Sequence, residues 1–174
     1  MDATDVKEAT IGNGTMRVFD QKILESIGKK LLKKKQSIAV AESVTSGLLQ
    51  FAISGIPDAS CFFQGGITAY NIAQKFKHLR VEPLHALSVN CVSQKVAKEM
   101  ATQVCHLYAS DWGIGITGYA SPTPESGNKV FAFFAIASRG KIKSSGKIDP
   151  QKTDPPELQT WYVNYILRKL VSLL

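Results

Sequence analysis

Cysteine is scarce in this sequence, and that scarcity argues against two classes of protein. Only three cysteines are present, Cys61, Cys91 and Cys105, so they form no even disulfide framework. Their wide spacing also matches no metal-binding motif. Such usage is typical of a protein from a reducing compartment. We therefore expect three buried, unreactive thiols, and we expect neither a metal nor a cofactor.

Long hydrophobic runs and a signal peptide are missing as well. No apolar stretch approaches the length needed to span a bilayer. The first residues, Met1-Asp2-Ala3-Thr4-Asp5, contain neither the basic nor the apolar region of a signal peptide. A hydrophobic fraction of 44% over 174 residues is nevertheless enough for one domain with a substantial core. The sequence thus predicts a cytoplasmic protein that makes no membrane contact.

Arginine clusters interleaved with aromatic residues, a feature of nucleic-acid binding, are also absent. The formal net charge is +7, and much of it lies between Lys29 and Lys35. These lysines fall on a predicted helix whose apolar residues recur along one face, namely Phe19, Ile23, Ile27 and Leu31. We expect the lysines to cover the solvent-facing side of that helix, and the sequence does not favour a nucleic-acid partner.

Predicted helices and strands alternate along the chain. The patterns predict helices at 19–35, 45–54, around Lys75, at 94–108 and from 155 onward, with Asp20 and Ser93 available as caps. They predict strands at 37–42, 65–70, 112–117, 130–138 and 142–148. The last two strands resemble a hairpin. The order implies a three-layer α/β/α sandwich with a mixed, mainly parallel sheet.

No internal repeat or linker divides this predicted domain, which covers residues 19–174, and residues 1–18 read as a flexible lead-in. On the helix 94–108, Val96, Met100, Val104 and Leu107 are expected to share one face. Apolar residues near the C-terminus are compatible with a symmetric homodimer.

The segment richest in potentially reactive groups is Glu42-Ser43-Val44-Thr45-Ser46-Gly47, which follows a predicted buried strand and precedes an apolar helix. Such a turn presents hydroxyl groups and free main-chain N–H groups at the carboxyl edge of a sheet, where open α/β folds bind ligands. Ser43 lies at its centre. The pattern alone allows three roles for Ser43: nucleophile, phosphate ligand or helix cap.

Two more segments of this kind follow other predicted strands. One is Gly65-Gly66-Ile67-Thr68-Ala69-Tyr70-Asn71 continuing to Lys75, and the other is Ile116-Thr117-Gly118-Tyr119-Ala120-Ser121-Pro122. If their strands are parallel neighbours, all three segments meet at one edge of the sheet. Taken together and in this order, they resemble the C-terminal domain of the CinA (competence/damage-inducible) family, over almost all of the chain from Phe19. The resemblance implies hydrolysis of the amide of nicotinamide mononucleotide to nicotinate mononucleotide and ammonia.

Carboxamide hydrolysis requires a nucleophile, a base, support for the oxyanion and an acid for the departing ammonia. Ser43 is the candidate nucleophile and needs a base to activate it. No histidine lies within the three segments, whereas burial can lower the pKa of a lysine and Ser–Lys pairs are a known variant. Lys75 is therefore the candidate base. The family resemblance points to the same two positions.

Further roles follow partly from the resemblance. Tyr70 could stack on the nicotinamide ring or hydrogen-bond within the Ser43–Lys75 pair, and Thr117, beside Gly118, could orient the amide. The candidate substrate-binding residues on the first segment are Glu42, Thr45, Ser46 and Gly47. Glu42 could hold a ribose hydroxyl or pair with a lysine, and the main-chain N–H groups of 45–47 could bind the oxyanion or the phosphate.

Ordinary structural roles stay open beside these functional ones. Thr45 and Ser46 are common capping residues, and a lysine on a short helix, such as Lys75, is usually solvated. Tyr70 could belong to the edge of the core, and Thr117 could satisfy a local main-chain group. Gly65 and its neighbour Gly66 could form a β-bulge.

The chain departs from the family's usual motifs at several positions. Val44 replaces a cysteine, Ser46 and Ser121 replace glycines, and Phe131 stands where a glycine is common. Near the last helix, where family members carry arginines suited to a phosphate, the first arginine is Arg168. The reactive pair is thus retained while the binding residues differ. An alternative is a non-catalytic nucleotide-binding or interaction domain of the same family.

Overall fold

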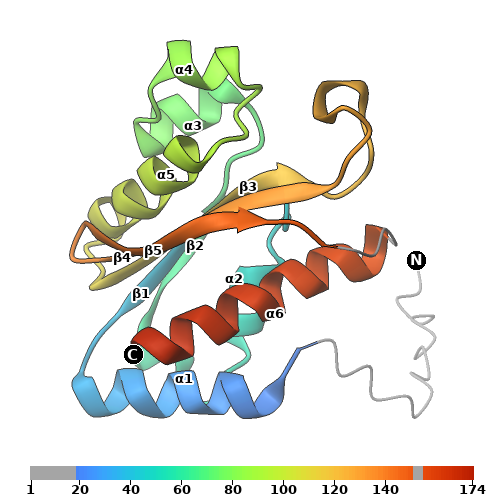
Figure 1. The fold of residues 1–174 in the computed structure, drawn as a ribbon. Coiled ribbons are helices and arrows are strands. Elements are labelled where there is room, and N and C mark those ends of the chain that lie inside the picture. The colour runs from blue at the N-terminus through green and yellow to red at the C-terminus, as the bar shows by residue number, and fades with distance from the viewer. Residues whose placement is uncertain (1–18, 151–154) are drawn as a thin grey trace, which may run out of the picture.

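The structure is a computed structural model that describes residues 19–150 and 155–174. The predicted lead-in at 1–18 lies outside the described residues. Five strands form one mixed sheet in the order β2-β1-β3-β4-β5 (Figure 1). Their bounds are β1 Ile38–Glu42, β2 Phe63–Thr68, β3 Trp112–Tyr119, β4 Phe131–Ser138 and β5 Lys141–Ile148. β1 pairs in parallel with β2 and β3, whereas β4 is antiparallel to both of its neighbours. β4 therefore runs alone against the other four strands.

Helices cover both faces of the sheet and complete the predicted three layers. Their bounds are α1 Gln21–Lys34, α2 Leu48–Ser54, α3 Ile72–Leu79, α4 Pro83–Ser88, α5 Gln94–Leu107 and α6 Pro155–Leu173. Figure 1 shows α1, α2 and α6 on one face and α3, α4 and α5 on the other. Short 3₁₀ turns, Ala59–Cys61 and Pro124–Ser126, lie in two of the connections. The predicted sandwich with a mixed sheet is confirmed.

Large and small residues alternate along β1. Successive side chains of a strand point to opposite faces of the sheet, so each face of β1 carries residues of one size. Ile38 and Val40 join the large core cluster beneath α1, α2 and α6, while Ala39 and Ala41 face α3 and α5. On the neighbouring strand β3, Gly115 also leaves room for α5, because a Cβ there would lie 2.4 Å from the carbonyl oxygen of Ala97 on that helix. Small residues therefore allow α5 to pack directly on the middle of the sheet.

The predicted capping residues set the starts of α1 and α5, and the differences elsewhere have local causes. The Asp20 carboxyl accepts from Ile23 N–H, and the Ser93 hydroxyl accepts from Val96 N–H. The second helix begins at Leu48 rather than at residue 45, because the preceding residues form a tight turn. Helix α4 was not predicted, since six residues are too few to show a helical period.

Two expectations about side-chain burial are wrong. Leu107, in the last turn of α5, is 48% exposed. The buried face of that helix is instead extended by alanines and by Cys105. Of the three cysteines only Cys105 is buried, while Cys61 is exposed and Cys91 is half-buried.

The bulge expected at the glycine pair in β2 is present. The register between β1 and β2 shifts by one residue between Ile38 and Ala39, and Gly65 adopts a φ of +127° at that point. A Cβ on Gly65 would also lie 2.9 Å from the Tyr108 ring. These glycines therefore serve packing, and they lie outside the pocket described below.

The part of the chain that the structure describes holds no helix with both the length and the apolar composition needed to cross a membrane.

Candidate functional site

Ser43 directly follows β1 in a tight turn at the carboxyl edge of the sheet. The turn closes when Ser46 N–H donates to the Ser43 carbonyl at 3.2 Å, and Gly47 then caps α2 with a φ of +99°. A positive φ of this size favours glycine. Ser43 itself is 8% exposed, so its hydroxyl lies close to the floor of a pocket rather than in open solvent.

The carboxyl group of Glu42 occupies the N-terminus of α2. It is fully buried and accepts four hydrogen bonds, from the Thr45 hydroxyl at 2.6 Å and from the N–H groups of Gly47, Leu49 and Gln50 at 3.2, 3.0 and 2.8 Å. Free N–H groups at a helix N-terminus normally attract an external anion. Here the protein's own carboxyl group satisfies them, and Glu42, Thr45 and Gly47 do not line the pocket.

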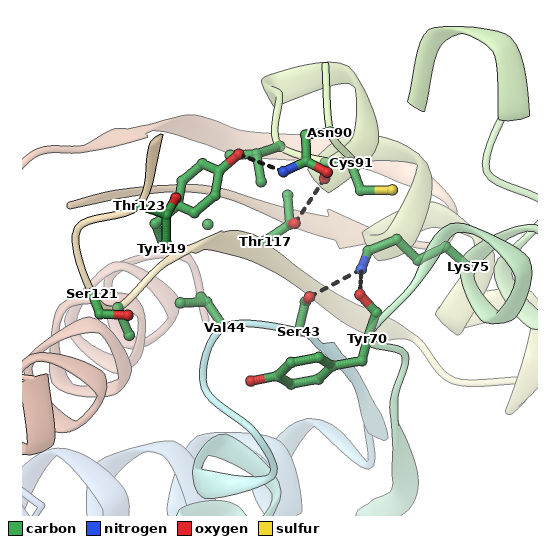
Figure 2. Close-up of a pocket in the computed structure, with 13 residues that line it drawn as sticks. Ser43, Val44, Tyr70, Lys75, Asn90, Cys91, Thr117, Tyr119, Ser121 and Thr123 are labelled. Carbon is green, nitrogen blue, oxygen red and sulfur yellow. Dashed lines mark hydrogen bonds between the residues drawn. The ribbon is translucent and has the colours of Figure 1, made fainter. Parts of the chain in front are cut away.

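Lys75 lies on α3 and reaches back to the turn after β1. Its side chain is buried, and its Nζ contacts the Ser43 Oγ at 2.9 Å, the Ala69 carbonyl at 2.7 Å and the Tyr70 carbonyl at 3.1 Å. Figure 2 shows the ammonium end between Ser43 and the main chain of Tyr70. The solvated-lysine alternative therefore does not apply to Lys75.

Burial lowers the pKa of Lys75 from 10.5 to about 8, because the charged form loses its hydration. The electrostatic interaction with Cys91 acts in the opposite direction and raises this pKa. A fraction on the order of one tenth of the amine is consequently neutral at pH 7. The geometry and the lowered pKa together make Lys75 competent to accept a proton from Ser43.

A pocket of about 310 Å³ opens above this pair. Its walls come from five places in the chain: Ser43 and Val44, the Tyr70–Lys75 region, the loop 90–92, the end of β3, and the loop 120–123. Because β2, β1 and β3 are parallel neighbours, their carboxyl ends meet at this edge of the sheet. The sequence segments predicted to converge do so.

Tyr70 lines the pocket with its ring, but its hydroxyl group touches neither Ser43 nor Lys75. The side chain is 67% exposed, and the hydroxyl lies 3.3 Å from Ser46 Oγ at the outer rim. Only the Tyr70 main-chain carbonyl contacts Lys75. Ser46 has a φ of 52° and also receives the Gln159 amide at 3.4 Å, which ties this rim to α6.

Thr117 and Gly118 both line the pocket, as predicted from their position at the end of β3. The Thr117 hydroxyl donates to the Cys91 carbonyl at 2.8 Å, so it fixes the loop 90–92 against the sheet. A Cβ on Gly118 would lie 2.4 Å from the Phe131 carbonyl oxygen. Close packing against β4 is therefore sufficient reason for a glycine at this position.

The loop 90–92 was not foreseen as part of the site. Asn90 and Cys91 have positive φ angles of 48° and 60°, and the Asn90 amide donates to the Tyr119 hydroxyl at 3.0 Å across the pocket (Figure 2). Thr123, on the loop after β3, also lines the pocket and was not predicted. An asparagine after a short helix is a turn signal, but nothing local in the sequence indicates that this turn faces Lys75.

Within the described ranges, no three residues of the metal-ligating types cluster closely enough to hold an ion.

Comparisons with known proteins agree with this fold. The family model for the CinA C-terminal domain matches residues 20–174. A CinA-like protein of Chlorobium limicola is 38% identical over 129 residues, which cover 74% of this chain and 30% of that protein. A CinA-like protein of Picosynechococcus is 40% identical over 111 residues, covering 64% of this chain and 26% of that protein. This chain thus spans less than a third of the length of these curated relatives.

A competence-damaged protein (CinA) superfamily protein from Escherichia coli has a closely similar solved structure. It superposes with a TM-score of 0.83 and 25% identity, and the match covers 98% of this chain and 99% of that chain. A superfamily protein from Klebsiella pneumoniae superposes with a TM-score of 0.82 at 24% identity, over 87% of this chain and 95% of that one.

Proposed function

The chain belongs to the CinA C-terminal domain family, and we propose that it is an amidohydrolase that hydrolyses a pyridine carboxamide through Ser43 and Lys75. The family resemblance implies nicotinamide mononucleotide as the substrate, with nicotinate mononucleotide and ammonia as products. The observation that carries the proposal is the buried 2.9 Å contact between Ser43 Oγ and Lys75 Nζ on the floor of the pocket.

The surroundings of Lys75 favour a base aimed at Ser43. A neutral amine has two N–H groups and one lone pair. The carbonyls of Ala69 and Tyr70 can accept the two N–H groups at 2.7 and 3.1 Å, which leaves the lone pair for the Ser43 hydroxyl proton. Two main-chain acceptors thereby orient the base, as an orienting carboxylate does in a catalytic triad.

The reaction then follows in two halves. Ser43 Oγ attacks the carboxamide carbon while its proton passes to Lys75, and the resulting ammonium returns that proton to the departing nitrogen. The C–N bond breaks, ammonia leaves and an acyl ester remains on Ser43. Water next attacks this ester with Lys75 as its base. The C–O bond to Ser43 breaks, the proton on Lys75 returns to the serine oxygen, and the carboxylic acid product leaves and loses its proton to solvent.

The oxyanion formed in each half needs a hydrogen-bond donor. The sequence offers the main-chain N–H groups of 45–47 as candidate oxyanion donors. The N–H of Gly47 is already bonded to Glu42, so it does not serve in that role. Val44, directly after the nucleophile, lines the pocket, and no acceptor among the described residues contacts its N–H. We assign the Val44 N–H to the oxyanion.

A pyridinium ring in this pocket also suits the proposed base. The aromatic side chains of Tyr70 and Tyr119 border the pocket, and aromatic faces attract cationic rings. A positive ring beside Lys75 would disfavour the ammonium form further. Substrate binding would thus promote the neutral amine that the first proton transfer requires.

Ammonia release from nicotinamide mononucleotide by the purified protein tests the proposal. We expect wild type to form ammonia and nicotinate mononucleotide, and we expect Ser43→Ala and Lys75→Met each to lose at least about 10³-fold in kcat. Matched controls are Ser54→Ala on α2 and Lys77→Met on α3, because both side chains are exposed and outside the pocket.

Equal activity in Ser43→Ala and wild type would contradict the proposal. Thermal stabilisation by the mononucleotide without any product would instead favour the alternative, a nucleotide-binding domain without catalysis.

A further inference from the structure

Three successive carbonyl groups in the turn after β1 are hydrogen-bonded, and the middle one has an unusual partner. The Ser43 carbonyl accepts from the main-chain N–H three residues further on at 3.2 Å, and the Thr45 carbonyl does the same at 2.9 Å. The Val44 carbonyl lies between them and accepts instead from the side-chain amide of Gln159 at 2.7 Å. Gln159 lies on α6, 115 positions further along the chain. A distant helix thus completes the hydrogen bonding of this turn.

The same amide group reaches a second residue of the turn. Its nitrogen lies 3.4 Å from Ser46 Oγ, and a primary amide has two N–H groups to donate. Gln159 is half-buried and does not line the pocket. Its contacts are therefore with the turn that carries Ser43, and any effect on a bound substrate must pass through that turn.

Gln159 is itself well fixed, as a residue that positions another must be. Its neighbours Leu158 and Tyr162 on α6 are buried in the large core cluster. The Tyr162 hydroxyl also donates to the Tyr119 carbonyl at the end of β3, at 3.1 Å. This part of α6 is thus tied both to the core and to the edge of the sheet that carries the pocket.

The contact with the Val44 carbonyl restrains the direction of the Val44 N–H. A peptide unit is planar, so the Val44 N–H shares one plane with the Ser43 carbonyl, and the Val44 carbonyl belongs to the next plane. The hydrogen bonds to these two carbonyls hold both planes and thereby the two main-chain angles of Val44. An oxyanion donor is effective only when it is aimed at the position where the charge develops.

We propose that Gln159 is a positioning residue, whose amide holds the Val44 main chain so that its N–H is aimed at the oxyanion. The inference rests on the proposed function, since this oxyanion forms only when Ser43 attacks a carbonyl group. Because the charge is present in the transition state and absent from the bound substrate, loss of the Gln159 donor should lower kcat and leave KM almost unchanged.

Two substitutions at this position test the inference in the ammonia assay with nicotinamide mononucleotide. Gln159→Met keeps a side chain of similar length without a donor, whereas Gln159→Lys restores a donor. We expect Gln159→Met to lose about 30-fold in kcat with KM within about twofold, and Gln159→Lys to recover kcat to within about fivefold of wild type. Arg168→Met, an exposed change on the same helix, is the matched control and should keep kcat.

Amide NMR relaxation measures the hold on the turn without any turnover. The heteronuclear NOE of the Val44 and Thr45 amides should fall in Gln159→Met and recover in Gln159→Lys, while that of Leu49 on α2 stays unchanged. A turn as rigid in Gln159→Met as in wild type would overturn the inference. A raised KM with unchanged kcat would do so too, as would a loss of kcat that Gln159→Lys does not repair.

The two measurements separate this inference from the proposed function. Absence of ammonia with wild type would contradict the proposed function, and the relaxation comparison would then decide by itself whether Gln159 holds the turn. Normal ammonia release by Gln159→Met would leave the proposed function intact and overturn the positioning role.

Discussion

At the scale of single residues, the site depends on a lysine that has been removed from water. Lys75 is buried beside a serine and two carbonyl oxygens, with no carboxylate among its hydrogen-bond partners in the described residues. Its pKa falls to about 8 because burial penalises the ammonium form. The property that suits Lys75 to act as a base therefore has a cost in stability.

Because of that cost, the difference in the free energy of unfolding between wild type and Lys75→Met should depend on pH. The unfolded chain binds a proton at Lys75 up to a pKa near 10.5, whereas the folded protein releases it near 8. Between these values the unfolded state binds more protons, so stability rises with pH. The free energy of unfolding of wild type should increase relative to that of Lys75→Met by about 2 kcal/mol from pH 8 to pH 10.

Urea unfolding of the two proteins at each pH measures this difference. The penalty is fully present below pH 8 and disappears above the unfolded pKa, so the two curves should diverge only in the alkaline range. Curves that stay parallel would mean that Lys75 keeps an ordinary pKa in the folded protein.

Tyr70 offers a separate test, because its ring and its hydroxyl group have different surroundings. The ring lines the pocket, while the hydroxyl contacts Ser46 at the exposed rim. We expect Tyr70→Phe to keep kcat and KM within about twofold, and Tyr70→Ala to raise KM about tenfold through lost ring contact. A fall in kcat of more than about 100-fold in Tyr70→Phe would show that the hydroxyl takes part in proton transfer.

At the scale of elements, the turn between β1 and α2 is held from within by Glu42. Four donors converge on this one buried carboxyl group, and three of them are N–H groups at the start of α2. The turn that carries Ser43 thus has its shape fixed before any ligand binds. Glu42 is in this respect a positioning residue.

Glu42→Ala should therefore destabilise the protein, because buried donors would lose their acceptor. We expect the free energy of unfolding to fall by about 3 kcal/mol in urea unfolding, and kcat to fall with little change in KM. Glu25→Ala, an exposed change on α1, is the matched control and should shift stability by less than about 0.5 kcal/mol. Unchanged stability combined with a raised KM would instead support the substrate-binding role that the sequence suggested for Glu42.

At the scale of the whole molecule, the feature that the sequence analysis anticipated is the convergence of three strand ends at one edge of the sheet. Three strand ends rich in polar residues converge because β2, β1 and β3 are parallel neighbours, and this brings Lys75 to Ser43 across 32 positions of sequence. Strand periodicity located the three strand ends, whereas their adjacency in the sheet was a condition of the prediction, and the choice of Lys75 was also guided by the family resemblance. The sheet therefore brings Ser43 and Lys75 together.

The walls of the pocket could not be predicted in the same way. Asn90 reaches the site only because α4, too short to show a period, turns the chain back towards β3. The Glu42 contacts extend to Gln50, eight residues further along, and depend on where α2 begins. These features arise from long-range packing, which local patterns do not contain.

The central claim is that neutral Lys75 activates Ser43, and the rate at which a fluorophosphonate probe labels Ser43 tests it most directly. Intact-mass spectrometry would follow the adduct across a range of pH without requiring knowledge of the substrate. We predict a single adduct, on Ser43. Its rate of formation should rise with pH and level off above about 8, where the pKa of Lys75 lies. The adduct should form at least about 100-fold more slowly in Lys75→Met. No adduct on Ser43, or equal rates in wild type and Lys75→Met, would contradict the claim.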